Sequence, residues 1–166
     1  MKEKIQAFYS RLRNEKREEA QVGWRQNHSQ NLNFIDLMSF VGESACGTVD
    51  KSSGRVDTLL DAGCGKGDLV HFIDNYGDAA SLPDLEYTGW DINEEFIKEA
   101  KENHPSENFG IRDVSGPITE KFDWIIASGS FSVNISEGDV KKQYRYLADS
   151  IGNLFNACKK GMAFSL

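Results

Sequence analysis

The stretch of sequence that indicates the fold runs from Val56 to Leu69 and reads VDTLLDAGCGKGDL. Its apolar beginning, Val56 to Leu60, predicts a buried strand, and a carboxylate, Asp61, follows that strand. Three glycines at alternate positions come next: Gly63, Gly65 and Gly67. Glycine lets a chain turn sharply and lets a ligand lie close to the backbone. The stretch therefore predicts a nucleotide-cofactor site at the end of a strand.

Short apolar runs alternate with helical patterns after this stretch, which is typical of strand-helix-strand units. The expected helices cover Asp68–Tyr76, a segment from Asn93 to about Asn103, and Val140–Cys158, with Gly161 as the cap of the last. The further expected strands are Tyr87–Trp90, Phe109–Ile111, Phe122–Ala127 and Met162–Leu166. The predicted fold class is α/β, with a doubly wound, Rossmann-like, mostly parallel sheet and helices on both faces.

At 166 residues, one domain spanning 1–166 is expected. Residues 1–45 are expected to form a helical extension or lid, and residues 55–166 the cofactor-binding core. Ile5, Phe8, Tyr9 and Leu12 recur at helical spacing. A polar loop over Gly23–Asn31, a second helix from Leu32 that stops near Gly42, and a linker over Gly47–Gly54 are expected to follow.

The last expected strand, Met162–Leu166, ends the sequence without an element to cover it. An apolar strand with an unpaired edge is usually avoided in natural proteins. We therefore expect the C-terminal strands of the fold to be missing, or another element or subunit, such as the second copy in a homodimer, to cover this edge.

The composition excludes several classes of protein. The apolar runs are far too short to span a membrane, and the N-terminus lacks the apolar segment of a secretory signal, so a cytoplasmic location is expected. Three widely spaced cysteines without a Cys-x-x-Cys pair favour reduced thiols and no metal site. A net charge of −7 makes nucleic acid an unfavourable partner and favours a small-molecule substrate.

Carboxylates follow three of the expected strands: Asp61, Asp91 and Asp113. In an open parallel sheet these strand ends line the ligand crevice. Asp91 lies 24 residues after Gly67, roughly the spacing at which an acid accepts hydrogen bonds from ribose hydroxyls. Asp113, at the third strand end, is placed to accept a hydrogen bond from an adenine amino group.

With these motifs the chain, from about Arg55 to Leu166, resembles the class I S-adenosylmethionine-dependent methyltransferases. The resemblance rests on four segments: Asp61–Gly67, Asp91-Ile92, Asp113-Val114 and Phe122–Ser128. It implies S-adenosylmethionine as cofactor and S-adenosylhomocysteine as product. It also implies that Gly63 and Gly65 approach the methionine part, with Ala62, Cys64 and Gly67 in the same cofactor-binding loop. By the same resemblance, Asp61 orders the loop and the amino group, Ile92 packs on adenine, and Ser128 lies near the transferred methyl.

A dinucleotide site is the nearest competing interpretation. Aligning Gly63 and Gly65 with its first two glycines requires a third small residue where this chain has Asp68. A carboxylate at a helix start also opposes pyrophosphate, whereas S-adenosylmethionine carries a cationic amino group and a sulfonium. Two alternatives stay open: a non-catalytic nucleotide-binding domain and an NAD(P)-dependent oxidoreductase.

The segment before the first strand resembles a little-characterised bacterial and phage-like branch of the same family. The matching residues are Gly23-Trp24, Ser29-Gln30 and Phe34, while Asn33 stands where that branch is expected to have arginine. The resemblance implies that Trp24 and Gln30 help to close over the cofactor. A purely structural role for Trp24, as the anchor of a loop, is the alternative.

The catalytic residue is left unassigned, because methyl transfer from a sulfonium needs alignment and exclusion of water more than it needs a base. His28 lies in a polar segment that could cover the cofactor. Phe131 and Asn134 follow the fourth strand and are expected, with His28, to border the substrate pocket. The segment after that strand has neither the Asp/Asn-Pro-Pro-aromatic nor the Pro-Cys sequence of common DNA methyltransferases, which again favours a small-molecule acceptor.

Overall fold

The computed structural model describes residues 7, 27–48, 55–77, 82, 84–131 and 139–166. The helices are α3 (Asn27–Thr48), α4 (Asp68–Tyr76), α5 (Glu94–Asn103) and α6 (Val140–Ala157). The strands are β1 (Asp57–Ala62), β2 (Leu85–Asp91), β3 (Asn108–Ile111), β4 (Phe122–Ala127) and β5 (Cys158–Phe164). The helical pattern expected around Ile5 to Leu12 lies outside the described residues. None of the helices in the described ranges is long and apolar enough to cross a membrane.

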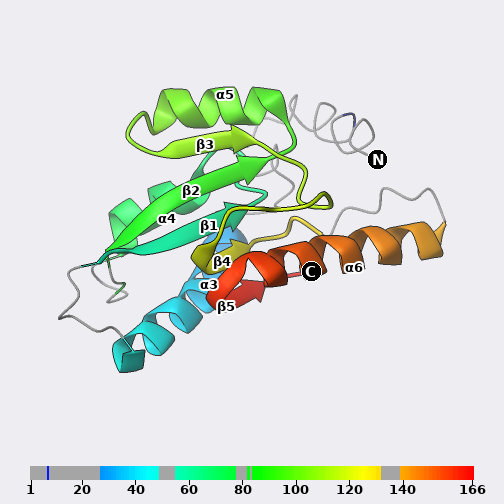
Figure 1. Cartoon of the computed structure of the whole chain (residues 1–166). Helices are drawn as coiled ribbons and strands as arrows, with labels where there is room; N and C mark the ends of the chain where they lie inside the picture. The colour runs from blue at the N-terminus through cyan, green and yellow to red at the C-terminus, as the bar shows by residue number, and fades with distance from the viewer. Residues whose placement is uncertain (1–6, 8–26, 49–54, 78–81, 83, 132–138) are drawn as a thin grey trace.

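The strands form one parallel sheet in the order β3-β2-β1-β4-β5 (Figure 1). The chain builds outward from β1 to β3 and then returns to the other side of β1, so the order reverses between β1 and β4. This is the doubly wound arrangement, in which ligands bind beyond the carboxyl ends of the strands at the reversal point. The fold class predicted from the sequence is confirmed, with five strands in the sheet.

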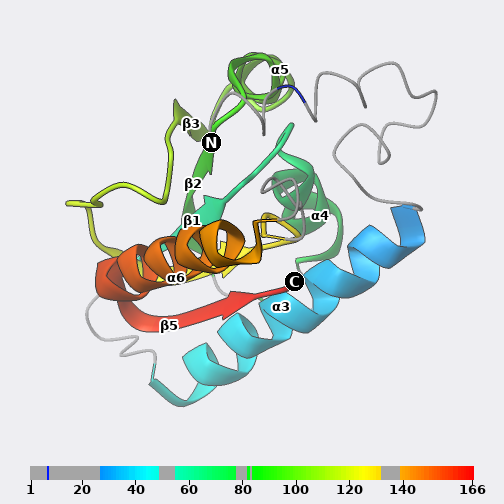
Figure 2. The same ribbon diagram turned by 90° about the vertical axis from the view of Figure 1, so that its right-hand side faces the viewer.

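Helices cover both faces of the sheet, as Figures 1 and 2 show, with α3 and α6 on opposite sides of β5. Alternate residues along β1 point to opposite faces: Leu59 belongs to the core under α3, α4 and α5, and Leu60 to the core under α6. Both leucines are fully buried. Burial on both faces explains why β4, which is buried at every position, reads as an almost continuous apolar run rather than as an alternating one.

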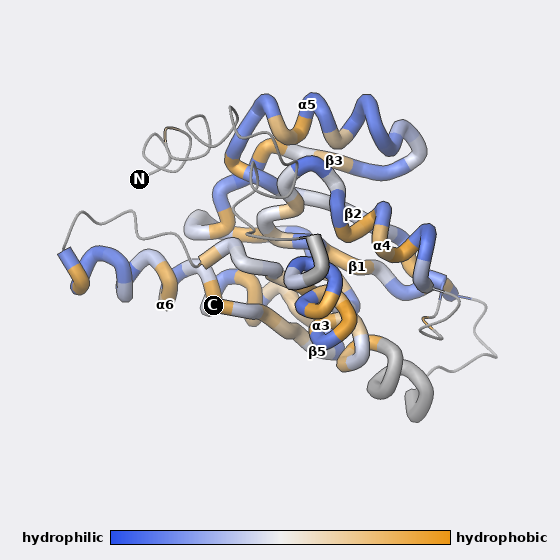
Figure 3. The backbone as a smooth tube through the Cα atoms, turned by 180° about the vertical axis from the view of Figure 1, so that it is seen from behind, coloured by the Kyte–Doolittle hydropathy of each residue, from blue (hydrophilic) through white to orange (hydrophobic). Residues whose placement is uncertain are grey.

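Helices α4 and α5 follow their sequence signals closely. Helix α4 spans the predicted residues, and Asn93 caps α5 by accepting a hydrogen bond from the Glu95 amide at 3.0 Å. Along α5 in Figure 3, hydrophilic and hydrophobic colours alternate, and Phe96, Ile97 and Ala100 are its buried residues. An apolar face buried against the sheet defines both helices, and α5 has a side-chain cap as well.

Helix α3 differs from the sequence prediction at both ends. It begins at Asn27, inside the expected loop over Gly23–Asn31, and it continues past Gly42 to Thr48, beyond the start of the expected linker. The reason at its N-terminal end is tertiary: Gln30 is buried and its amide donates to the Asp68 carboxylate at 2.9 Å. The polar residues before Leu32 resemble a loop in the sequence, because Asp68, the hydrogen-bond partner of Gln30, is 38 residues away.

The C-terminal boundary prediction is also wrong. Helix α6 ends at Ala157 and β5 begins at once, so Gly161 lies within the strand, opposite Trp124, and is not a helix cap. A Cβ on Gly161 would lie 2.7 Å from the Phe40 ring, so the glycine lets α3 pack on β5. Val140 and Tyr144, which recur at helical spacing with the apolar residues of α6, are 60% and 66% exposed, whereas Leu154 is fully buried.

At the end of the sheet opposite the ligand crevice, a buried carboxylate joins the starts of β1 and β4. Asp123 on β4 is 1% exposed and accepts hydrogen bonds from the Thr58 amide at 3.0 Å, the Thr58 hydroxyl at 2.9 Å and the Arg55 guanidinium at 2.6 Å. Burial opposes ionisation, but these bonds and the charges of Lys159 and Arg55 outweigh it and lower the pKa of Asp123 below its usual value. The carboxylate thereby ties β4 to the start of β1.

We predict that Asp123→Asn lowers the free energy of unfolding at pH 7 by about 1–3 kcal/mol, because buried donors lose their charged acceptor. The folded pKa is depressed, so the stabilisation is present above the unfolded value of about 4 and is lost as the pH falls through the folded value. In urea unfolding, the difference in free energy of unfolding between the unmodified protein and Asp123→Asn should thus shrink below about pH 4. Asp149→Asn, on the exposed side of α6, is the matched control, and a difference that persists in acid would contradict this assignment.

Candidate functional site

The glycine loop is attached to the end of β2 by three successive backbone amides. Gly63 and Cys64 donate to the Trp90 carbonyl at 2.6 and 3.0 Å, and Gly65 donates to the Asp91 carboxylate at 3.0 Å. Gly63 and Gly65 have φ values of +88° and +55°, which side chains rarely tolerate. The sequence forms this turn because glycine alone satisfies both the conformation and the close approach.

The segment after β4 packs directly on this loop. The Ser130 hydroxyl donates to the Ala62 carbonyl at 2.6 Å, and a Cβ on Gly63 would lie 2.7 Å from the Ser130 Cβ. The ends of β1 and β4 are therefore joined where the strand order reverses. Absence of a side chain at Gly63 is what permits the join.

Gly67 has a different role from the other two glycines. Its φ is +89°, and a Cβ there would lie 2.8 Å from the His104 ring and 3.3 Å from Phe109. It is the N-cap of α4 and is not among the residues that line the pocket. In this structure, the missing side chain at Gly67 lets the backbone pack closely on His104 and Phe109.

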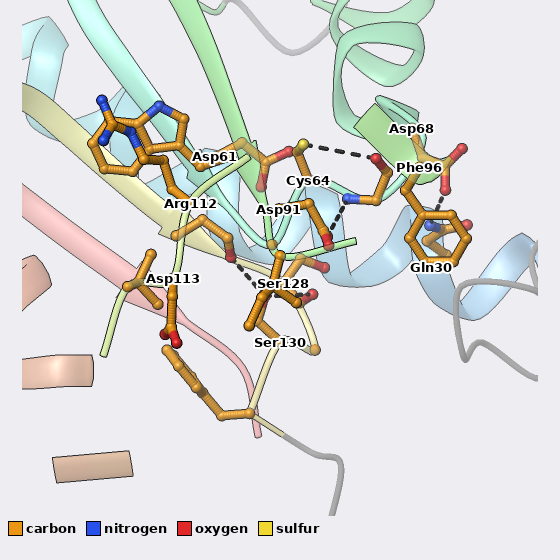
Figure 4. Close-up of a pocket in the computed structure, with 18 of the residues that line it drawn as sticks. Gln30, Asp61, Cys64, Asp68, Asp91, Phe96, Arg112, Asp113, Ser128 and Ser130 are labelled. Carbon is orange, nitrogen blue, oxygen red and sulfur yellow. Dashed lines mark hydrogen bonds between the residues drawn. The ribbon is translucent and has the colours of Figure 1, made fainter. Parts of the chain in front are cut away.

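A pocket opens beyond the carboxyl ends of the strands and encloses about 810 Å³, including space open to solvent (Figure 4). Its lining comes from the glycine loop, the ends of β1 to β4, and helices α3 to α6: Gln30, Phe34, Asp61–Gly65, Asp68, Trp90–Ile92, Phe96, Arg112–Val114, Ser128–Phe131 and Tyr146.

Asp91 is the most constrained carboxylate of the pocket. One oxygen, Oδ2, accepts from the Gly65 amide, and the other, Oδ1, accepts from the Asn93 amide at 2.7 Å. Burial raises the pKa of Asp91, and the amide bonds oppose that rise. The Ile92 amide also bonds to this carboxylate. A carboxylate has about four acceptor positions, so three backbone amides leave Asp91 able to accept from a further hydroxyl donor.

Asp61 is more deeply buried and less well paired. It accepts a hydrogen bond from the Tyr87 hydroxyl at 2.8 Å, and burial raises the pKa of Asp61 to about 7 despite that bond. Nearby, burial raises the pKa of the Cys64 thiol well above its usual value, so this thiol is not an activated nucleophile. The floor of the pocket therefore holds a carboxyl poised between its charged and neutral forms.

The other side of the pocket combines exposed and half-buried groups. Asp113 is exposed, and its Oδ1 accepts from the Ser115 amide at 3.0 Å and hydroxyl at 2.7 Å, while Oδ2 takes part in neither bond. Burial raises the pKa of Tyr146 to about 12, so its hydroxyl stays protonated. The Arg112 guanidinium lies 5.6 Å from the centre of the Trp90 ring.

Helix α3 forms one wall of the pocket through side-chain contacts. Besides the Gln30–Asp68 bond, the Asn33 amide donates to the Ser128 hydroxyl at 2.7 Å. Phe34 lines the pocket and its ring lies 5.6 Å from that of Phe72. The helix is thus linked both to the start of α4 and to the end of β4.

Most predicted site residues come together in this pocket. Those that line it are Gln30, Asp61, Ala62, Gly63, Cys64, Gly65, Asp91, Ile92, Asp113, Val114, Ser128 and Phe131. Gly67 lies outside the lining. Trp24 and Asn134 fall outside the described residues, as does the side chain of His28, whose backbone belongs to α3.

Sequence reasoning missed a set of lining side chains: Phe34, Trp90, Phe96, Arg112, Ser130 and Tyr146. Trp90 and Arg112 directly precede the predicted acids Asp91 and Asp113, so their position in the sequence could have indicated a place in the site. Tyr146 lies on α6, 15 residues after Phe131, the lining residue nearest to it along the chain, and the packing of α6 on the sheet brings it to the pocket.

The electrostatic character of the pocket separates classes of ligand. Four carboxyl groups line it, Asp61, Asp68, Asp91 and Asp113, against the single described cation Arg112. Asp68 also lies at the N-terminus of α4, the place where a dinucleotide fold binds pyrophosphate. The pocket therefore favours a ligand that carries positive charge and disfavours a pyrophosphate.

Comparison with known protein families identifies a methyltransferase domain in this chain. The methyltransferase domain family matches residues 60–161. A search of curated proteins finds no match.

Solved structures of S-adenosylmethionine-dependent methyltransferases share the fold. The plantazolicin methyltransferase BpumL in complex with SAH has a TM-score of 0.62 at 15% identity, with 97% of this chain and 58% of that chain covered. A methyltransferase from Clostridium acetobutylicum has a TM-score of 0.51 at 20% identity, with 84% and 50% covered. The chain thus spans between half and three fifths of the length of these two structures. Because the family match covers more than half of the sequence, the chain belongs to the methyltransferase domain family and has the fold of S-adenosylmethionine-dependent methyltransferases.

Proposed function

We propose that this chain binds S-adenosylmethionine in the pocket at the carboxyl ends of β1 to β4 and transfers its methyl group to a small-molecule acceptor. The observation that carries the proposal is the Asp91 carboxylate, which fixes the glycine loop through Gly65 and, after its backbone bonds, keeps acceptor capacity for a ribose hydroxyl. The family match supports the reaction class. The complete protein's activity is part of this proposal.

The residues of the pocket fit the three parts of the cofactor. Asp91 would accept the ribose hydroxyls, and Ile92 and Val114 supply apolar surface for adenine beside the acceptor oxygen of Asp113. Asp61 and the open backbone at Gly63 and Gly65 would hold the methionine part. Each of these side chains lines the pocket, and the acids match the positive charge of the ligand.

The chain's own residues need to orient the reactants and exclude water. When bound, S-adenosylmethionine supplies an electrophilic methyl group, and its sulfur takes the electron pair of the broken bond. Ser128 and Phe131 lie at the end of β4, the side at which an acceptor would enter. The buried Phe131 ring lies 6.2 Å from the ring of Phe164, which gives that side an apolar border.

A small-molecule acceptor is supported by charge. The net charge of −7 and the acid-lined pocket both repel a phosphate backbone. Substrate contacts from His28 and Asn134, cofactor closure by Trp24 and a cytoplasmic location belong to the same proposal. A domain that binds the cofactor without catalysis is the second candidate.

Ligand-dependent thermal denaturation tests the cofactor class. We expect S-adenosylmethionine and S-adenosylhomocysteine, each at a hundred times its dissociation constant, to stabilise the protein by about 2.7 kcal/mol, and NAD to have no effect. Stabilisation by NAD alone would contradict the proposal. Transfer of a labelled methyl group to candidate acceptors then separates an enzyme from a binding domain.

Substitution of the ribose acceptor tests the site itself. Asp91→Asn should weaken S-adenosylhomocysteine binding about 10- to 100-fold in calorimetry, because one acceptor oxygen and the charge are lost at a buried position, a cost of about 1–3 kcal/mol. Asp36→Asn makes the same change on the exposed face of α3 and should leave the affinity unchanged. Equal affinities of the two variants would remove Asp91 from the site.

A further inference from the structure

We propose that Asp61 and Tyr87 form a charge-selective pair: Asp61 ionises when a ligand brings a cation to the methionine end of the pocket, and its proton is released to solvent. The inference rests on the proposed function, because it takes the ammonium group of S-adenosylmethionine or S-adenosylhomocysteine as that cation. It assigns to Tyr87, which does not line the pocket, a positioning role.

The pair is a buried, fixed unit on the floor of the pocket. Asp61 is 2% exposed and lines the pocket from β1, while Tyr87 is 5% exposed on the neighbouring strand β2. The Tyr87 hydroxyl donates to Asp61 Oδ2 at 2.8 Å. The ring of Tyr87 packs against Phe109 with 5.7 Å between ring centres, which holds the hydroxyl in place.

The charged groups that face Asp61 within the described chain are acidic. Asp91 at the end of β2 and Asp68 at the start of α4 both oppose its ionisation, and the Cys64 thiol beside it is neutral. The described residues include no ion pair to Asp61. Burial without a counter-charge is costly for a carboxylate, and the consequence is the pKa of about 7 given above.

A cation in the pocket favours the ionised form of Asp61 over the neutral form. An ammonium group within the pocket supplies the missing counter-charge, so the O–H bond of the Asp61 carboxyl breaks, the proton goes to water, and the carboxylate pairs with the ligand. Tyr87 stays protonated, since burial and the neighbouring Asp61 raise the pKa of its phenol well above the usual value. Its hydroxyl therefore donates to the anion and limits how high the pKa of Asp61 rises.

Two ligands that share a nucleoside separate the titration of Asp61 from that of groups that contact the nucleoside. S-adenosylhomocysteine carries the amino acid, and 5′-methylthioadenosine lacks it, so titration of Asp91 at the ribose affects both alike. We expect the ratio of their affinities, measured from about pH 5.5 to 7.5, to rise toward tenfold per pH unit in acid and to level off near pH 7. Calorimetry of S-adenosylhomocysteine binding near pH 6 in buffers of different ionisation enthalpy should count about one proton released.

Two variants assign the effect to the pair. Asp61→Asn should abolish both the proton release and the pH dependence of the affinity ratio. Tyr87→Phe keeps the ring that packs on Phe109 but removes the donor, so the pH at which the ratio levels off should rise. Unchanged binding of 5′-methylthioadenosine by each variant shows that the pocket is intact.

The outcomes distinguish this inference from the proposed function. Parallel pH profiles for the two ligands in the unmodified protein would overturn the charge-selective pair while leaving the cofactor assignment in place. A Tyr87→Phe profile identical to that of the unmodified protein would overturn the role of Tyr87. Failure of both ligands to bind at every pH would overturn the proposed function and the inference together.

Discussion

The glycine loop is held at the tip of β2 by three consecutive amides, and the geometry of the whole site depends on this attachment. The Trp90 carbonyl and the Asp91 carboxylate receive those amides at 2.6 to 3.0 Å. Because Asp91 also lines the pocket, one side chain both shapes the loop and faces the space in which we propose that the cofactor binds. In that proposal, loop conformation and ligand binding are coupled through the same carboxylate.

Charge gives the pocket its chemical selectivity. Acidic side chains surround the crevice, and their effect is strengthened by burial, since a low-dielectric site magnifies interactions between charges. Asp91 is partly compensated by backbone amides, whereas Asp61 has a phenol as its partner. Two carboxyl groups on adjacent strands thus have different electrostatic environments because their hydrogen-bond partners differ. Asp68, held by Gln30, extends the acidic surface to the place where a pyrophosphate would bind.

Sequence reasoning worked best where local signals coincide with tertiary needs. Strand β4 and helix α4 have the predicted bounds, because an apolar run and an amphipathic segment that follows a glycine turn are each sufficient to define them. It was wrong where the deciding partner is remote. Gln30 reads as a loop residue until Asp68 is brought beside it, and Gly161 reads as a helix cap until Phe40 and Trp124 are packed against it. Glycine in particular has several structural uses that a single sequence does not separate.

The sequence by itself determined the class of fold, the position of the glycine loop and the acids at the strand ends, because those features depend on residue type and on spacing along the chain. Only the tertiary structure decided which face each side chain takes. It brought Tyr146 from α6 and Phe34 from α3 to the same pocket, moved Gly67 out of the lining, and placed Tyr87 against Asp61. The physical reason is that contacts between elements follow from packing and strand register, which bring together residues distant in sequence.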